Sequence, residues 1–437
     1  MLALIYLVMV AVNWQDVPPS DLAIKINEQL DKRGSIADQN NAYIFFLGVS
    51  APPDADPMTM GIMRHKWLEQ EMAKERFDGS DDPLAHDYDF KSKRSKAVIE
   101  FAESCSKIDA ECLKAFEQGA EIIDEWLVEE QWLLERYRAL IKMSEYEEIV
   151  NIDVSAPLPS YRFIYAGQRL LLAKAWMLAD KGNFDSARTL LEKDLSFWRM
   201  VLANSDHILT KMLATAAVTR HFKYGNLVLR RIPEHELPDA IPGSWHIPIN
   251  LSERSMRRCL VDEWLFTDRI IHSIKDEELG LGPWGMAWWK IVKPFWQSQD
   301  SMNRYAEMIL ELTKLYDAPY PSVPDAIAKS ELVGESYFRP FSRIFNATGD
   351  VYFTTYFPST FGYALRIADL EGLRRAALVT ANFRARGIKV DGIGEALSTS
   401  DIRDPYWNNS FSWDEETNSV VFIGLQPNER GQHSILF

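Results

Sequence analysis

The chain contains few cysteines. Three occur among its 437 residues, too few for the disulfide scaffold of a small secreted domain, and a chain of this length can bury a large core without one. Cys105 and Cys112 lie seven positions apart, which permits a small disulfide loop in an oxidising compartment. We predict this disulfide, although two reduced cysteines on one side of a helix have the same spacing. Cys259 is predicted to be a buried small hydrophobe.

Basic residues are in the minority. The 48 Lys and Arg face 63 Asp and Glu, giving a net charge of −15. Such a chain repels phosphate backbones, so nucleic acid is not expected as a partner. The segment Glu117–Glu148 holds ten carboxylates and three basic side chains. We interpret it as a solvated helix face, with a site for a cation or a basic partner as the alternative.

The common catalytic motifs are missing. The sequence has no P-loop and no glycine-rich dinucleotide fingerprint, and GESYF at Gly334 lacks the closing glycine of a nucleophile elbow. His235 and Glu236 begin like a zinc-protease helix, but Asp239 occupies the position of the second histidine. The sequence therefore predicts no cofactor and indicates none of these enzyme classes.

Two sets of residues have a spacing that could place them around a metal. They are His65 with Glu69, and Asp268 with His272 and Asp276. Exposed ion pairs on helices have the same four-residue spacing. We interpret both sets as ion pairs and predict no metal site.

Adjacent carboxylates provide the acid/base candidates. Asp262 and Glu263 lie in a helical stretch, where neighbouring residues point in different directions. Such pairs arise by chance in an acidic chain. If the protein is an enzyme, we expect an all-helical envelope hydrolase in which Asp262 or Glu263 acts with groups from separate helices.

Long apolar runs are rare, and the longest opens the chain. The first twelve residues, MLALIYLVMVAV, contain no polar side chain except that of Tyr6. A helix of this length rises about 18 Å, less than the roughly 20 residues that cross a bilayer, which leaves open whether the natural chain starts upstream of Met1. No small-x-small cleavage site follows. We predict an uncleaved inner-membrane anchor, with an apolar helix docked on the body as the alternative.

A second apolar segment is rich in tryptophan. LGPWGMAWWKIVKPFW, residues 281–296, contains two lysines, no acid, and the four tryptophans Trp284, Trp288, Trp289 and Trp296. Tryptophan at the end of a core helix explains this pattern. An amphipathic helix in a membrane interface or on a partner explains it too, and the anchor favours this second interpretation.

The middle of the chain predicts helical hairpins. From about Val98 to Phe345, long helical segments are separated by breaks at prolines and at Gly182. The segment Ala175–Leu195 resembles one tetratricopeptide unit, with matches at Ala175, Leu178, Gly182, Phe184, Ala187 and Leu191. Asp194 replaces a later small residue of that family, and no second copy follows after 34 residues. The resemblance therefore predicts one hairpin rather than a solenoid.

The C-terminal segment predicts a helix followed by a β-hairpin. Apolar residues repeat every three or four positions over 360–386, and Gly387 follows as a C-cap. Strands are predicted at 411–413 and 419–423, joined by a turn at 414–418. Four apolar side chains are expected to cover the helix, namely Phe411, Trp413, Val421 and Ile423.

This arrangement resembles the globular end of type II secretion pseudopilins. The matching positions are Gly387, Asp404, Pro405, Tyr406 and the segment Val420–Gly424. The N-terminus has neither a prepilin cleavage motif nor an early Glu in its apolar run. The resemblance therefore implies a shared local topology and not assembly into a pilus.

The whole chain resembles a family of uncharacterised proteobacterial membrane-anchored envelope proteins. The matching features are the apolar start leading into Asn13–Ser20, the segment Asn41–Pro52, and the Asp-Pro hairpin at the end. The resemblance implies a periplasmic location on the inner membrane and brings no known activity with it.

Together these features predict a mainly α protein, with a multi-helical body of antiparallel hairpins and a small C-terminal helix-plus-β-hairpin unit. The predicted division is an anchor at 1–12, an N-terminal segment at 13–97, the helical body at 98–350 and the C-terminal unit at 351–437. We expect a non-enzymatic protein that is anchored in the inner membrane and serves as a binding scaffold for another envelope component. The envelope hydrolase is the alternative.

Overall fold

The computed structural model describes residues 1–30, 35–74, 79–148, 156–273, 276, 280–340, 342–356 and 360–437. Within these ranges the chain is mostly helical and ends in a small antiparallel sheet, which confirms the predicted fold class. The helices are α1 (Leu2–Val12), α2 (Asp21–Leu30), α3 (Ala42–Gly48), α4 (Pro57–Met72), α5 (Lys96–Ser104), α6 (Ala110–Gln118), α7 (Ala120–Glu129), α8 (Gln131–Leu140), α9 (Tyr161–Asp180), α10 (Phe184–Asn204), α11 (Ile208–Leu229), α12 (Leu237–Ala240), α13 (Leu251–Arg254), α14 (Arg257–Ser273), α15 (Pro283–Val292), α16 (Ser298–Tyr316), α17 (Val323–Tyr337), α18 (Ala347–Tyr356), α19 (Phe361–Ala385) and α20 (Ile393–Thr399).

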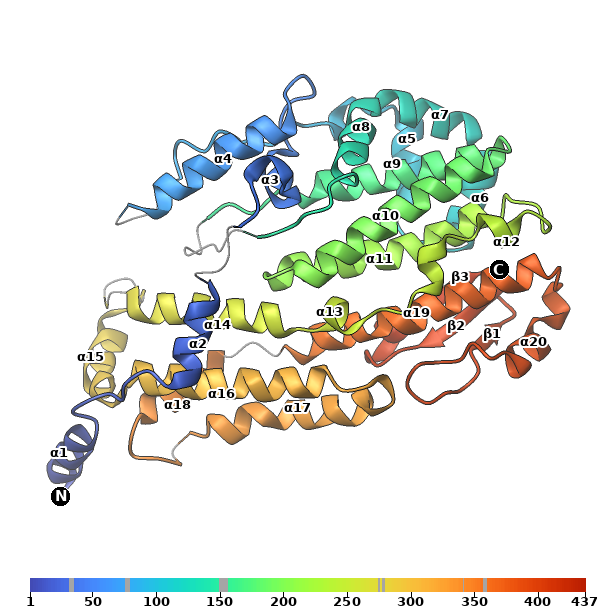
Figure 1. The fold of residues 1–437 in the computed structure, drawn as a ribbon. Helices are drawn as coiled ribbons and strands as arrows, with labels where there is room; N and C mark the ends of the chain where they lie inside the picture. The colour runs from blue at the N-terminus through green and yellow to red at the C-terminus, as the bar shows by residue number, and fades with distance from the viewer. Residues whose placement is uncertain are drawn as a thin grey trace.

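The long helices form two groups. In Figure 1, α9, α10 and α11 lie above α14, α16 and α17, and α19 with the sheet closes the end opposite α1. Helix α11 contacts both α14 and α19, so it joins the groups. Buried apolar residues form one cluster that extends from Ala23 to Leu436. The predicted N-terminal segment, helical body and C-terminal unit therefore share a single core, to which the described residues of 1–12 do not contribute.

The hairpin that resembles a tetratricopeptide unit is formed by α9 and α10. Gly182 adopts a φ of +78° in the turn between them, a conformation that glycine reaches without strain. Ala187 and Leu191 are fully buried in α10. The hairpin is confirmed at the predicted residues.

The loop between α3 and α4 is held by one buried arginine. Arg136 of α8 donates hydrogen bonds to the carbonyl oxygens of Val49 (3.1 Å), Ala51 (2.5 Å) and Ala55 (2.7 Å), and also to that of Pro52. Burial lowers the pKa of Arg136 to about 10, against the opposing effect of nearby aspartates. The guanidinium thus satisfies carbonyls that the irregular loop would otherwise bury without partners.

The acidic segment Glu117–Glu148 is not entirely a solvated face. Glu130 is buried and accepts hydrogen bonds from Arg94 Nη2 and Trp126 Nε1, both at 3.0 Å. Glu148 is buried as well. The prediction was wrong for these two carboxylates, because partners distant in sequence make their burial possible.

The C-terminal unit contains one strand more than predicted. Strands β1 (Ser412–Asp414), β2 (Ser419–Ile423) and β3 (Gln432–Leu436) pair antiparallel in the order β1-β2-β3. The predicted hairpin is β1 with β2, and β3 was missed. The prediction that Ile423 covers the helix was also wrong, because its side chain is 55% exposed. It is Phe422 that packs against Gly372 of α19, since neighbouring strand residues point to opposite faces.

Both parts of the pseudopilin-like motif meet one buried carboxylate. Asp369 of α19 accepts hydrogen bonds from the Tyr406 hydroxyl (2.8 Å) and the Leu425 amide (2.9 Å) through Oδ1. Asp404 in turn accepts from the Tyr406 amide at 2.7 Å. These bonds hold the Asp-Pro segment and the end of β2 on α19, so the motif has a structural role here.

Cys105 and Cys112 form a disulfide, with their sulfur atoms 2.16 Å apart. Cys105 caps α5 and Cys112 lies in the first turn of α6, which excludes the single-helix alternative. Cys259 is buried as predicted, and burial raises the pKa of its thiol.

Reduction of this disulfide is expected to lower the free energy of unfolding by about 2 kcal/mol, the entropy of closing so short a loop. Thermal unfolding with and without reductant measures the change, and the Cys105→Ala/Cys112→Ala variant should not respond to reductant. A thiol titration in denaturant should find one thiol per chain before reduction and three afterwards. Three thiols in the unreduced protein would contradict the assignment.

Candidate functional site

The apolar helix α1 is fixed to the folded body by Asn13. The side-chain amide of this buried residue donates to the Ile344 carbonyl at 3.1 Å, and its Oδ1 accepts from the Asn346 amide at 2.7 Å. Its backbone carbonyl accepts from Gln297 Nε2 at 2.8 Å. These bonds connect the end of α1 to two segments that lie far along the chain, so α1 has a defined direction relative to the body.

Asp16 makes a second attachment. Its Oδ2 accepts from the Gln299 amide at 2.8 Å and its Oδ1 from the Asp300 amide at 3.1 Å. These amides belong to the first turn of α16, where a carboxylate satisfies free N–H groups and complements the helix dipole. Asn13 and Asp16 of the Asn-Trp-x-Asp segment thus both attach the end of α1 to the body.

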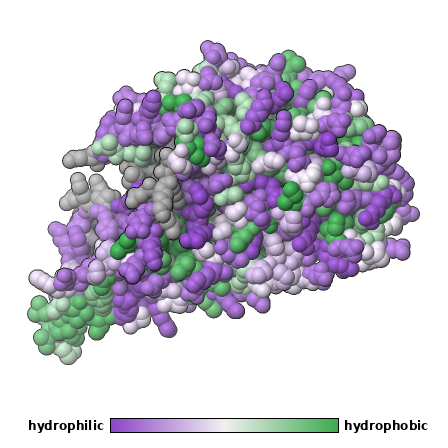
Figure 2. All heavy atoms as spheres, in the orientation of Figure 1, coloured by the Kyte–Doolittle hydropathy of each residue, from purple (hydrophilic) through white to green (hydrophobic). Residues whose placement is uncertain are grey.

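Helix α1 also contacts the end of α15 and the segment that follows it. The ring of Tyr6 packs edge-on against Phe295, with centroids 5.4 Å apart, and the Tyr6 hydroxyl donates to the Ile291 carbonyl at 3.2 Å. Several other apolar side chains on α1 are exposed, including Leu4, Leu7 and Val8, whereas Met9 and Val10 are half-buried. Figure 2 shows a hydrophobic group at the end of the molecule where α1 lies in Figure 1.

The four tryptophans of residues 281–296 differ in exposure, two being exposed and two half-buried. Trp289 donates to Asp276 Oδ1 at 2.9 Å, and its ring lies 6.1 Å from that of Trp296. Trp284 and Trp288 point outward and are 89% and 65% exposed. Trp289 and Trp296 are thus half-buried and lie outside the core cluster, whereas the outward pair has the exposure that an interfacial or partner patch requires.

The exposed tryptophans lie on one face of α15. Trp284, Trp288 and Ile291 are spaced by four and three residues, which places them on the same side of a helix, and all three are exposed. Trp14, between the two attachment residues, is 84% exposed. We call α1, Trp14 and this face of α15 the apolar end. No helix in the described ranges is both long and apolar enough to cross a membrane.

The acid/base candidates lie elsewhere, on α14. Asp262 is buried, and its Oδ2 is 2.7 Å from Nδ1 of His207 at the start of α11. The His207 amide donates to Glu148 at 2.6 Å. The structure therefore places Asp262 beside a histidine from another helix. Neither Asp262 nor Glu263 lines the cavity described below.

Burial, followed by the charge of Asp262, raises the pKa of Glu263. The folded state therefore disfavours the ionised carboxylate of Glu263. As a result, the free energy of unfolding falls as pH rises through the raised pKa. Glu263→Gln is expected to raise the melting temperature at pH 7.5, with the gain fading toward pH 4.5. Differential scanning fluorimetry across this range measures it.

The matched variant Asp262→Asn should have the opposite effect at neutral pH, because it removes the charged partner of His207. Equal gains for both variants, or a gain for Glu263→Gln that does not depend on pH, would contradict the assignment.

A second aspartate–histidine pair was not predicted from the sequence. Asp194 Oδ2 lies 2.8 Å from His221 Nδ1, and Trp245 Nε1 donates to His221 Nε2 at 2.9 Å. Gln168 donates to the same carboxylate at 3.1 Å. Both side chains of the pair are fully buried, and both ring nitrogens of His221 are engaged. The network therefore stabilises the packing of α9, α10 and α11 and offers no open catalytic atom.

In the sets that could have surrounded a metal, each histidine lies beside a carboxylate. His65 lies 3.2 Å from Asp38 and 3.7 Å from Glu69. Asp268 and His272 are 3.4 Å apart. Over the ranges given above, no three His, Cys, Asp or Glu side chains are grouped to hold a metal.

Comparison with known proteins returns no match of any kind, whether to a protein-family model, a curated protein or a solved structure.

Proposed function

We propose that the protein is held on the periplasmic side of the inner membrane by its apolar end and serves as a binding scaffold for another envelope component. The observation that carries this proposal is the apolar end itself. An exposed apolar helix is fixed in direction by Asn13 and Asp16. Exposed tryptophans accompany it, and tryptophan favours the boundary between headgroups and acyl chains.

The dimensions of α1 fit a shallow mode of attachment. Eleven helical residues extend for about 16 Å, roughly half of the 30 Å hydrocarbon core. The described part of α1 therefore reaches through about one leaflet. Trp14, Trp284 and Trp288 can then lie at the interface, and the tethers at Asn13 and Asp16 set the orientation of the body.

The disulfide supports the compartment, because such bonds persist in oxidising environments. The scaffold role is motivated by the α9–α10 hairpin, which resembles one unit of a repeat family whose stacked units present binding surfaces. The proposed partner is an envelope protein that binds the helical body while the apolar end holds the body at the membrane.

Flotation with phosphatidylcholine vesicles tests the attachment. The full chain should float with the vesicles and remain bound in high salt, because apolar burial is not screened by ions. A protein that stays at the bottom of the gradient, or that is released by salt, contradicts the proposal. Crosslinking in intact cells followed by purification should then recover one reproducible envelope partner.

The envelope hydrolase remains a second candidate because of one observation, the 2.7 Å contact between His207 and Asp262. An aspartate in this position can orient a histidine that accepts a proton from a nucleophile. Hydrolysis of a model ester or peptide that disappears in Asp262→Asn, with the fold intact, would favour the enzyme. Wild-type protein without such activity favours the scaffold.

A further inference from the structure

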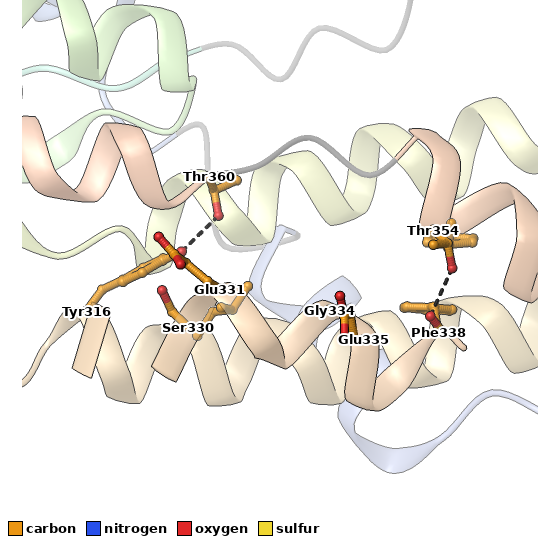
Figure 3. Close-up of a pocket in the computed structure, with 10 residues that line it drawn as sticks. Tyr316, Ser330, Glu331, Gly334, Glu335, Phe338, Thr354 and Thr360 are labelled. Carbon is orange, nitrogen blue, oxygen red and sulfur yellow. Dashed lines mark hydrogen bonds between the residues drawn. The ribbon is translucent and has the colours of Figure 1, made fainter. Parts of the chain in front are cut away.

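A cavity of about 510 Å³ lies among α16, α17, α18 and the start of α19, and its described lining residues include neither Asp262 nor any residue of the apolar end. Cavities of this size hold small organic molecules. Its two ends differ in chemistry. Figure 3 shows Tyr316, Ser330 and Thr360 gathered at one end and Phe338 with Thr354 at the other, with Gly334 between them.

The polar end is built from buried hydroxyl groups. The Tyr316 and Thr360 hydroxyls are 3.2 Å apart and form a hydrogen bond. Ser330, one turn before Gly334 on α17, is also buried and donates to the Ile327 carbonyl at 2.7 Å. Each hydroxyl keeps an acceptor lone pair that a ligand N–H group could use.

The other end is aromatic. The rings of Phe338 and Phe353 stack with centroids 4.5 Å apart and an angle of 12° between their planes. Arg304 lies over the Phe338 ring, 4.7 Å from its centroid, and is itself paired with Asp300 and Asp350. The aromatic pair thus offers an apolar wall to a hydrocarbon chain, while the nearby cation is neutralised by its own partners.

Gly334 leaves the space between these ends open. A Cβ atom at this position would meet no atom within 4 Å, so the backbone itself does not require glycine there. Glycine inside a helix is less favourable than alanine, and Gly334 lies in the last turns of the fifteen-residue helix α17. Close packing therefore does not explain the glycine at position 334. The absence of a side chain there leaves the cavity unfilled.

The charge around the cavity is negative. Glu331 and Glu335 line it from successive turns of α17, and both are exposed at its rim. Among the described residues that line the cavity, none is a lysine, arginine or histidine. A carboxylate rim above a polar end favours a cation and repels an anion.

We propose that this cavity binds a small amphiphilic amine, in which an ammonium group is carried on an apolar chain. The ammonium group lies between the two rim glutamates and the Tyr316–Thr360 hydroxyls, and the chain extends over Gly334 toward Phe338 and Phe353. This binding does not depend on attachment to a membrane, so the two proposals can fail separately.

Calorimetric titration of the full chain with octylammonium chloride, below its micelle concentration and without lipid, tests the proposal. Saturable binding of one molecule per chain is expected, with sodium octanoate binding at least about tenfold more weakly. Glu331→Gln/Glu335→Gln should weaken octylammonium roughly tenfold and reduce the preference over octanoate. These side chains are exposed, so the variant is expected to keep the fold.

Two further variants separate this cavity from other apolar surfaces. Gly334→Leu should fill the space and abolish binding, while the melting temperature stays equal or rises, because leucine favours the helix. Trp284→Ser/Trp288→Ser should leave the affinity unchanged. The proposal is overturned if octylammonium does not saturate, if octanoate binds equally well, or if a folded Gly334→Leu protein or the double glutamine variant binds like the wild type.

Discussion

Replacing Trp284 and Trp288 with serine is expected to lower the partition of the protein onto phosphatidylcholine vesicles at least about tenfold. Both side chains are mostly exposed in the absence of a membrane. Moving such a ring out of water contributes roughly 1–2 kcal/mol even when burial is incomplete. Tenfold corresponds to about 1.4 kcal/mol, so the pair together should exceed this threshold. Vesicle flotation or sedimentation over a range of lipid concentrations measures the partition coefficient.

The chain offers a matched control for this variant. Trp407 is 52% exposed, but it belongs to the C-terminal unit at the other end of the fold. Trp407→Ser removes a comparable ring and should leave vesicle binding unchanged. If Trp407→Ser and the Trp284→Ser/Trp288→Ser variant reduce binding equally, attachment is not specific to the apolar end.

Replacing Gly61 with alanine is expected to destabilise the fold by about 3 kcal/mol or more. Helices α3 and α4 cross with their backbones in direct contact, and a Cβ atom on Gly61 would lie 1.9 Å from the Ile44 carbonyl oxygen. The obstacle is backbone and not the end of a flexible side chain, so one helix must move. Every residue of α3 is buried, so that displacement would disrupt core packing. The midpoint of chemical denaturation measures the loss.

Gly394→Ala is the control for this substitution. Gly394 also lies in a helix, α20, but a Cβ there would meet no atom within 4 Å. We expect this variant to be as stable as the wild type or more stable by up to about 1 kcal/mol. A small effect at Gly61, similar to that at Gly394, would show that α3 and α4 do not pack as closely as described.

The sequence predicted those parts of the fold that local patterns determine. The helical periodicity, the turn at Gly182 and the β1–β2 hairpin each depend on residues that are close together in the chain. Strand β3 was missed because QHSIL shows little alternation and pairs through its backbone with β2. The face of β2 was assigned wrongly at Ile423, because four consecutive apolar residues leave the inward positions undetermined.

The site was predicted in part. The helical spacing of Trp284 and Trp288, and the different register of Trp289, could have separated the outward residues from the inward one. The partners of Asn13 and Asp16 could not have been found, since they lie more than 280 residues along the chain. The same holds for the cavity over Gly334, which is formed by four helices.

We expect the apolar end to contact a lipid bilayer. Amide hydrogen exchange of the full chain, followed by mass spectrometry with and without phosphatidylcholine vesicles, tests it most directly. Vesicles should slow exchange in peptides covering residues 1–17 and 281–296 and leave α9, α10, α11 and the C-terminal sheet unchanged. Unaltered exchange in both segments, or protection centred on the helical body instead, would contradict the claim.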